Sequence, residues 1–180
     1  VLRRTMLMLM PLMLVVMLCL AVGIARRGRG VLAIDADPQS NLSMTLLDGA
    51  TAEPPTLGHV LLDQADVMDA VRPTRVPGLD VLPADAQLAD AALLLADQMG
   101  REKRLRAALA DVAGRYDFVI ADAAPQLNLV TINVLNAVGE LVVPVDAGLY
   151  SVAGLGRLQE TIDQVRRYLD NPGLRIGGCS

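Results

Sequence analysis

Short apolar runs alternate with amphipathic stretches along most of this chain. An apolar run bounded by turn residues is typical of a buried parallel strand, and apolar residues every three or four positions are typical of a helix. The pattern predicts strands at residues 31–35, 79–83, 118–122, 140–145 and 174–176. It predicts helices at residues 41–47, 57–62, 66–71, 85–99, 101–113, 128–138 and 152–169, with Ser151 as the N-cap of the last one. Because strands and helices alternate, the expected fold is α/β, with a doubly wound, mostly parallel sheet and helices on both faces.

Composition and charge narrow the possible functions. The 180 residues are enough for one domain, and a content of 53% hydrophobic but only 2% aromatic residues favours helices packed on a parallel sheet over a β-sandwich. A net charge of -4 gives no general attraction to nucleic acid, so DNA binding would need a local basic patch such as Arg26–Arg29. The two cysteines, Cys19 and Cys179, are expected to be reduced thiols of a cytosolic protein, and the single histidine, His59, is given no role.

The first 25 residues differ from the rest, so residues 1–25 are treated as an apolar N-terminal segment and residues 26–180 as the domain. Met6–Ala25 carries no charge and has arginines on both sides. The stretch is long enough to span a bilayer, which takes about 20 apolar residues. It also has the basic start and the small-residue end of a signal peptide.

Carboxylates end two of the predicted strands: Asp35, with Asp37 close behind it, and Asp122. Ligands of open α/β sheets bind at the carboxyl ends of the strands, and acids placed there can hold a hydrated Mg²⁺. An Asp at a strand end is also common as a turn-forming or helix-capping residue. This pattern alone therefore leaves both interpretations open.

Longer segments around these acids resemble the ParA/Soj-type partition ATPases. Residues 31–42, Val-Leu-Ala-Ile-Asp-Ala-Asp-Pro-Gln-Ser-Asn-Leu, are similar to the family's switch segment, in which a strand runs into Asp-x-Asp-Pro-Gln-(Gly/Ser)-Asn. Residues 116–122, Tyr-Asp-Phe-Val-Ile-Ala-Asp, resemble its Walker B strand. Further matches, at residues 21–28, 129–137, 141–146 and 149–155, keep the family's order. The resemblance implies an incomplete P-loop NTPase-like sheet.

The resemblance also implies roles for single residues. Asp37 would orient the attacking water, and Asp35 and Asp122 would support the Mg²⁺ site. Gln39 and Asn41 would belong to the switch that senses the γ-phosphate. Phosphoryl transfer needs such parts because its catalysis is mostly positioning and charge stabilisation.

Cofactors and partners follow from the same resemblance. The implied cofactors are ATP and Mg²⁺, with Pro144 among the nucleotide-binding residues. The implied partners are a ParB-like protein, nonspecific DNA and a second copy of the chain. The implied location is the cytoplasm, at the nucleoid.

The family's phosphate-binding loop, Lys-Gly-Gly-Val-Gly-Lys-Thr, has no counterpart in this sequence. Counting back without gaps from Leu20, its place falls on residues 8–14, which read Met-Leu-Met-Pro-Leu-Met-Leu. A phosphate loop needs glycines that let backbone N–H groups approach the oxygens, and a cation to balance their charge. The sole lysine, Lys103, lies on the predicted helix before the Walker B strand. We therefore expect weak ATP binding and negligible hydrolysis, which leaves open whether this chain is an enzyme.

Three interpretations of residues 1–19 remain open: a sequence artefact or degenerate gene, a membrane or signal segment fused to a family remnant, and a remodelled strand and helix that still fill the sheet. The chain is also expected to be shorter at its C-terminus than the family, which continues with further strands and a DNA-binding surface. The leading interpretation is an impaired partition ATPase. The alternative is a non-catalytic remnant or a membrane-tethered pseudo-ATPase, anchored in the inner membrane by residues 6–25.

Overall fold

The computed structural model describes residues 2–112, 114–124, 127–142, 150–169 and 171–177. Its helices are α1 (Leu2–Ala25), α2 (Asn41–Leu46), α3 (Leu57–Leu61), α4 (Val67–Ala70), α5 (Leu88–Leu94) with the 3₁₀ turn η1 (Leu95–Asp97), α6 (Arg104–Ala110), α7 (Leu129–Ala137) and α8 (Tyr150–Tyr168). Its strands are β1 (Val31–Ala36), β2 (Arg72–Pro73), β3 (Leu79–Leu82), β4 (Phe118–Ala123), β5 (Glu140–Val142) and β6 (Arg175–Gly177). Every strand and helix that the sequence predicts has a counterpart, and α1 and β2 are additions.

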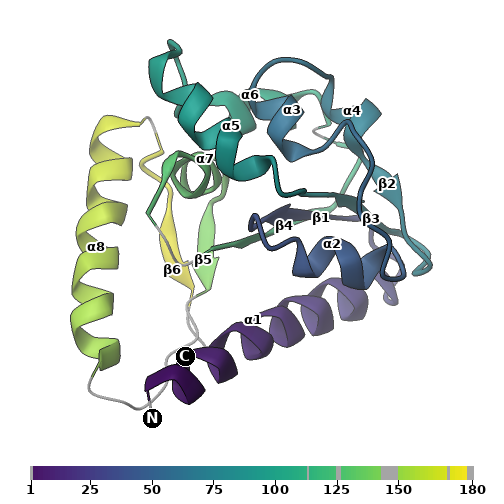
Figure 1. Ribbon diagram of the computed structural model, residues 1–180, viewed down its shortest axis with the longest axis horizontal. Coiled ribbons are helices and arrows are strands. Elements are labelled where there is room, and N and C mark those ends of the chain that lie inside the picture. The colour runs from purple at the N-terminus through teal and green to yellow at the C-terminus, as the bar shows by residue number, and fades with distance from the viewer. Residues whose placement is uncertain (1, 113, 125–126, 143–149, 170, 178–180) are drawn as a thin grey trace.

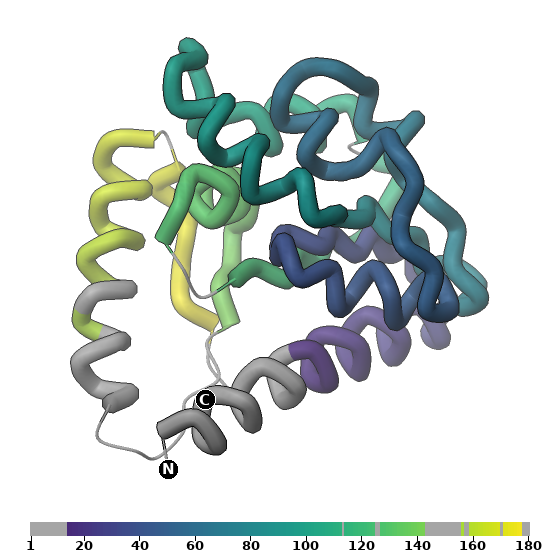
Figure 2. Tube along the Cα trace, viewed as in Figure 1, coloured from purple at the N-terminus to yellow at the C-terminus, as the bar shows by residue number. Residues whose placement is uncertain are grey.

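The strands form two sheets in the described part of the chain (Figure 1), and Figure 2 traces the course of the backbone through them in the same view. The larger sheet has the order β2-β3-β1-β4. Strand β1 runs parallel to both of its neighbours, with Val31 opposite Leu79 on one side and opposite Phe118 on the other, and only the short β2 is antiparallel. Strands β5 and β6 pair with each other in parallel. The predicted α/β fold with a mostly parallel sheet is confirmed, whereas its division into two sheets was not predicted.

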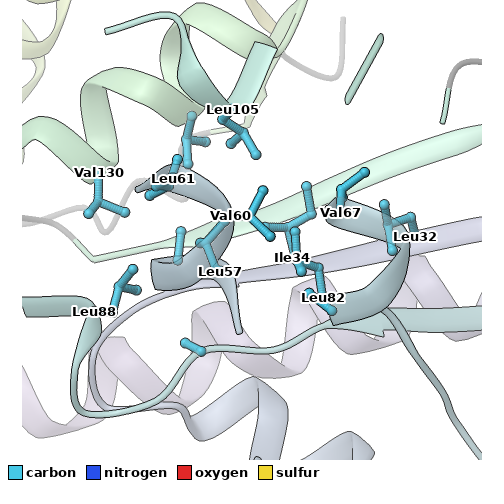
Figure 3. Close-up of a cluster of buried hydrophobic side chains, with 14 of the residues drawn as sticks. Leu32, Ile34, Leu57, Val60, Leu61, Val67, Leu82, Leu88, Leu105 and Val130 are labelled. Atoms are coloured by element: carbon cyan, nitrogen blue, oxygen red, sulfur yellow. The ribbon is translucent and has the colours of Figure 1, made fainter. Parts of the chain in front are cut away.

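Hydrophobic side chains fill both faces of the larger sheet, because successive side chains of a strand point to opposite faces. All residues of β1 are buried. Leu32 and Ile34 join a cluster with α3, α4, α5, α6 and α7, which Figure 3 shows in close-up. Val31 and Ala33 join a second cluster on the other face, with α1 and α2. The sheet therefore has helices on both faces, as the sequence predicts (Figure 1).

The apolar N-terminal segment forms α1, whose side chains are described from Leu14 onward. Met17, Ala21 and Ala25 are buried in the second cluster, against β1 and β3. Their spacing of four residues places them on one face of the helix, which is the face that covers the sheet. In the part of the chain that the structure describes, no helix combines the length and apolarity needed to cross a membrane. The division of the chain at residue 26 stays a prediction.

Two predicted helices, at residues 85–99 and 101–113, are shorter than expected. The Asp85 carboxylate accepts a hydrogen bond from the Gln87 backbone N–H and forms a turn, so α5 begins only at Leu88. Gly100 has a positive φ of 68° and separates η1 from α6, which begins at Arg104. A positive φ breaks a right-handed helix and costs least at glycine.

The predicted N-cap of the last helix is wrong. Helix α8 begins at Tyr150, so Ser151 lies within the helix and cannot be the non-helical residue that precedes it. The predicted strand at residues 140–145 is confirmed for β5, and residues 143–145 lie outside the described residues.

Candidate functional site

The three predicted acids gather at the carboxyl edge of β1 and β4. Parallel pairing of the two strands places Asp35 directly opposite Asp122. Neighbouring strands lie about 4.8 Å apart, so the two side chains start from adjacent points on the sheet. Asp37 follows β1 immediately, beyond its last residue, Ala36. Residues far apart in the sequence therefore form one acidic edge.

Asp35 is fully buried, and its two carboxylate oxygens accept three hydrogen bonds. Oδ2 accepts from the backbone N–H of Ser43 at 2.7 Å and from the Ser43 hydroxyl at 2.6 Å. Oδ1 accepts from the backbone N–H of Asp37 at 3.2 Å. Burial raises the pKa of Asp35 above its ordinary value, and the hydrogen bonds from Ser43 and Asp37 act in the opposite direction. These contacts hold the carboxylate of Asp35 in one orientation.

Residues 37–41, called the switch segment below, make a tight turn that leads from β1 into the first residue of α2. Asp37 Oδ1 accepts a hydrogen bond from the Gln39 backbone N–H at 2.9 Å, which closes the turn. Ser40 then has a left-handed φ of 55°, and α2 begins at Asn41. The side chains of Gln39 and Asn41 are exposed, and Asp37 is half-buried. The turn thus presents polar groups to solvent beside the acidic edge.

Burial and, after it, repulsion from neighbouring carboxylates perturb the pKa of Asp122. Burial, followed by the negative charges of Asp35 and Asp37, raises the pKa of Asp122 to about 6. The geometry agrees with this, because Asp35 lies opposite Asp122 across the two strands and accepts a hydrogen bond from the backbone N–H of Asp37. Such a concentration of negative charge favours protonation of Asp122 or the binding of a cation.

A magnesium ion fits this edge only with further ligands. Carboxylate oxygens are the ligands that Mg²⁺ prefers, but no group of three His, Cys, Asp or Glu side chains among the described residues could hold a metal ion. Magnesium sites often consist of one or two carboxylates, several waters and the phosphates of a substrate. Asp122 fits such a site if phosphate oxygens and water complete the coordination shell.

Residues 8–14, on which the phosphate loop falls when it is counted back without gaps from Leu20, lie inside α1. Backbone N–H groups inside a helix donate to the carbonyl four residues earlier, so they are not available to phosphate oxygens. Pro144, the remaining predicted nucleotide-binding residue, lies outside the described residues.

The sequence analysis did not identify Ser43 of α2, whose side chain contacts Asp35 in the interior of the protein. Its hydroxyl donates to Asp35 and accepts a hydrogen bond from the Ala84 backbone N–H at 2.9 Å, at the end of β3. Ser43 is buried at 1% exposure. The available signal was a small hydroxyl residue in the first turn of the helix predicted at 41–47, directly after the acidic motif.

The single histidine also has a structural part that the sequence analysis did not give it. His59 Nδ1 accepts a hydrogen bond from the Thr56 backbone N–H at 3.2 Å and completes a capping box at the start of α3. The Thr56 hydroxyl donates to Asp85 Oδ2 at 3.2 Å. The sequence signal is Thr-x-x-His, in which histidine replaces the Glu or Gln of the usual box. His59 also lines a groove of about 260 Å³ between α3 and α5, which none of the three site acids lines.

Comparison with known proteins places this chain among described relatives. A family model described as an AAA domain matches residues 15–176. The chromosome partitioning protein ParA of Caulobacter vibrioides is 42% identical over 161 residues, which cover 88% of this chain and 60% of that protein. The sporulation initiation inhibitor protein Soj of Bacillus subtilis is 41% identical over 152 residues, which cover 84% of this chain and 59% of Soj. The chain therefore spans about 60% of the length of these relatives.

A solved structure shows the same fold. The cobyrinic acid a,c-diamide synthase of Mycobacterium smegmatis, with a bound ATP analogue and magnesium, superposes with a TM-score of 0.84 and 32% identity. The superposition covers 91% of this chain and 66% of that protein. The acidic edge thus lies in a fold that binds nucleotide and magnesium in that protein.

Proposed function

The chain belongs to the ParA/Soj family of partition ATPases, and on that premise we propose that its acidic edge is the magnesium side of an ATP site whose phosphate side is impaired. The observation that carries this proposal is the pairing of Asp35 with Asp122 across β1 and β4, with Asp37 beside them. Ligands of parallel α/β sheets bind at this edge of the strands.

Each acid has a distinct part in the proposed site. Asp122, which is partly exposed and carries a raised pKa, would hold the Mg²⁺ through a water. Asp37, half-buried in the turn, orients the water that attacks the γ-phosphate. Asp35 supports both from within the sheet, because its oxygens are already engaged by Ser43 and Asp37.

The remaining nucleotide contacts come from the switch segment and from β5 onward. Gln39 and Asn41 are exposed and available to sense the γ-phosphate, and Pro144 belongs to the nucleotide-binding residues. When bound, Mg²⁺ neutralises charge on the phosphates. The protein's own task is to hold the acids and the attacking water in place.

Impairment follows from residues 8–14. This segment has neither glycine nor lysine, and its backbone N–H groups lie inside α1. ATP therefore meets carboxylates at this edge without the donors and the cation that offset phosphate charge. We infer weak ATP binding and negligible hydrolysis by the unaltered chain.

The partners proposed for the chain are those that its partition relatives suggest: a ParB-like protein, nonspecific DNA and a second copy of the chain, in the cytoplasm at the nucleoid. A second candidate function is a non-catalytic interaction module, or a pseudo-ATPase tethered to the inner membrane by residues 6–25. The absence of glycine and lysine from residues 8–14 favours this candidate.

Calorimetry and loop replacement test the proposal. Titration of the unaltered chain with ATP and Mg²⁺ is expected to show no micromolar binding. Replacing residues 8–14 by Lys-Gly-Gly-Val-Gly-Lys-Thr is expected to produce micromolar binding and measurable hydrolysis. In that restored chain, Asp37→Ala should abolish hydrolysis, whereas Asp97→Ala, which removes an exposed carboxylate of η1, should not.

Two results would contradict this function. Micromolar ATP binding by the unaltered chain would show that its phosphate side is intact. A restored chain that binds ATP but never hydrolyses it would show that the acidic edge is not catalytic, and the non-catalytic module would then be the better description.

A further inference from the structure

We propose that Ser43 is a positioning residue, which fixes Asp35 and through it the switch segment to the end of β3. The Ser43 hydroxyl lies between two groups, since it donates to Asp35 Oδ2 at 2.6 Å and accepts from the Ala84 N–H at 2.9 Å. The Ser43 backbone N–H donates to the same carboxylate oxygen at 2.7 Å. The proposed role of Ser43 in catalysis rests on the proposed ATP site. The structural link, which is the set of hydrogen bonds that joins Asp35 to Ala84 through Ser43, does not.

The hydrogen bonds that the Ser43 hydroxyl makes to Asp35 and Ala84 are hard to replace because they are buried. Asp35 is 0% and Ser43 1% exposed, so water is not at hand to replace a lost hydrogen bond. Without the hydroxyl, Asp35 loses its shortest hydrogen bond and the Ala84 N–H loses its partner. A buried polar group left unpaired is costly, and a carboxylate more so than a neutral group. The local structure must then shift to satisfy these groups.

A shift of Asp35 reaches the switch segment directly. Its second oxygen, Oδ1, accepts the hydrogen bond from the Asp37 backbone N–H. Rotation of the Asp35 carboxylate therefore displaces the first residue of the switch segment, whose side chain closes the following turn on Gln39. Ser43 thus controls the orientation of Asp37 without touching it.

The hydrogen-bond network also continues from Ala84 toward α5 and α3. Ala84 precedes Asp85, which accepts hydrogen bonds from the Gln87 N–H and from the Thr56 hydroxyl. The start of α5 and the start of α3 are thereby joined to the same polar interior. A hydroxyl is the smallest side-chain group that donates and accepts at once, which explains a serine rather than an alanine at this position.

Hydrogen exchange of the full-length chain tests the link. Ser43→Ala should accelerate exchange of the Asp37 and Ala84 amides by about tenfold or more relative to the Ala33 amide at the centre of β1. Ser43→Thr, which keeps the hydroxyl, should restore protection at both amides. Thr45→Ala is the matched control, because it removes an exposed hydroxyl of α2 that bonds only to Asn41 O and should leave both amides unchanged.

The outcomes separate positioning from general stability. Equal acceleration at the Asp37, Ala84 and Ala33 amides would mean that Ser43 only stabilises the fold and would overturn the proposal. Failure of Ser43→Thr to restore protection would overturn it as well. If Ser43→Ala does not fold, NMR of the unaltered chain decides: the proposal requires a slowly exchanging Ser43 hydroxyl proton close to the Ala84 amide, and its absence refutes it.

Enzyme kinetics of the loop-restored chain distinguish this inference from the proposed function. Ser43→Ala should lower kcat at least tenfold with a smaller change in KM, because the switch segment with Asp37 is misplaced while the restored phosphate loop still binds the nucleotide. An unchanged kcat in an active restored chain would overturn the catalytic part. An inactive restored chain would instead refute the proposed function, and the exchange experiment would still decide on the link.

Discussion

Asp122→Asn is expected to stabilise the protein at neutral pH. Burial and the charges of Asp35 and Asp37 raise the pKa of Asp122 from an ordinary value of 3.8 to about 6. Between about pH 4 and pH 6 the folded protein therefore holds a proton at Asp122 that the unfolded chain has already released, and above that range the folded protein bears the cost of an unfavourable negative charge. Replacing the carboxylate by an amide of nearly the same shape removes the cost of this charge.

The sign of the pH dependence follows from that difference in proton binding. Where the folded state binds more protons than the unfolded state, the free energy of unfolding falls as pH rises. The favourable contribution of Asp122 is complete below about pH 4 and is lost as pH rises through about 6. Asp35, whose pKa is also raised, acts in the same direction, so the Asp122→Asn variant retains the part of this slope that Asp35 contributes.

The magnitude is set by the size of the shift and by the exposure of the group. A rise in pKa from 3.8 to about 6 corresponds to about 3 kcal/mol if all of it is expressed in the free energy of unfolding. Because Asp122 is partly exposed, solvent screening reduces this to about 1–2 kcal/mol. The variant should therefore exceed the wild type by about 1–2 kcal/mol at pH 7.5 and by almost nothing at pH 4.

Urea unfolding at several pH values between 4 and 8, followed by circular dichroism, measures this difference. Asp97→Asn is the matched control, because it neutralises an exposed carboxylate and should change stability by less than about 0.5 kcal/mol at either pH. An Asp122→Asn chain that is no more stable than wild type at pH 7.5 would refute the reasoning. The three acids would then not form the repulsive group described above.

Two further predictions concern the scaffold that positions the site. Leu32→Ala should lower the free energy of unfolding by about 2–5 kcal/mol, because the Leu32 side chain of β1 is fully buried against the helices that cover one face of the sheet. Leu93→Ala, at a side chain 74% exposed, is the control and should cost less than about 0.5 kcal/mol. Equal effects in urea unfolding would contradict the packing. Asn128→Ala should cost about 1 kcal/mol because Asn128 Oδ1 accepts the Thr131 N–H as the N-cap of α7, and Asn128→Asp should retain most of that stability.

The elements near the acids could be predicted because their signals are local. The apolar run at 31–35 is a fully buried strand, and the run at 118–122 is its parallel neighbour. Each run is bounded by turn residues, and parallel strands place their carboxyl ends together, so the meeting of Asp35 and Asp122 follows from strand type alone.

The link behind the acids could not be predicted because it depends on contacts between distant residues. Ser43 and Ala84 are 41 positions apart, and one of the two partners is a backbone N–H that has no signature in the sequence. The start of α5 was predicted wrongly for a related reason. The turn at Asp85 competes with the helical pattern of the residues after it, and hydrophobic spacing does not show which of the two prevails.

The position of each acid in the sheet explains why similar side chains have different parts. Strand β1 lies between two strands, so Asp35 is enclosed and its oxygens are used to hold the protein together. Strand β4 is the last strand of the larger sheet, where Phe118 and Val119 are 46% and 38% exposed although parallel strands are usually covered on both faces. Because Asp122 lies on this outer strand, its carboxylate stays partly accessible to solvent. An inner acid whose oxygens are engaged by hydrogen bonds and an outer acid that stays open to solvent are thus consequences of strand order.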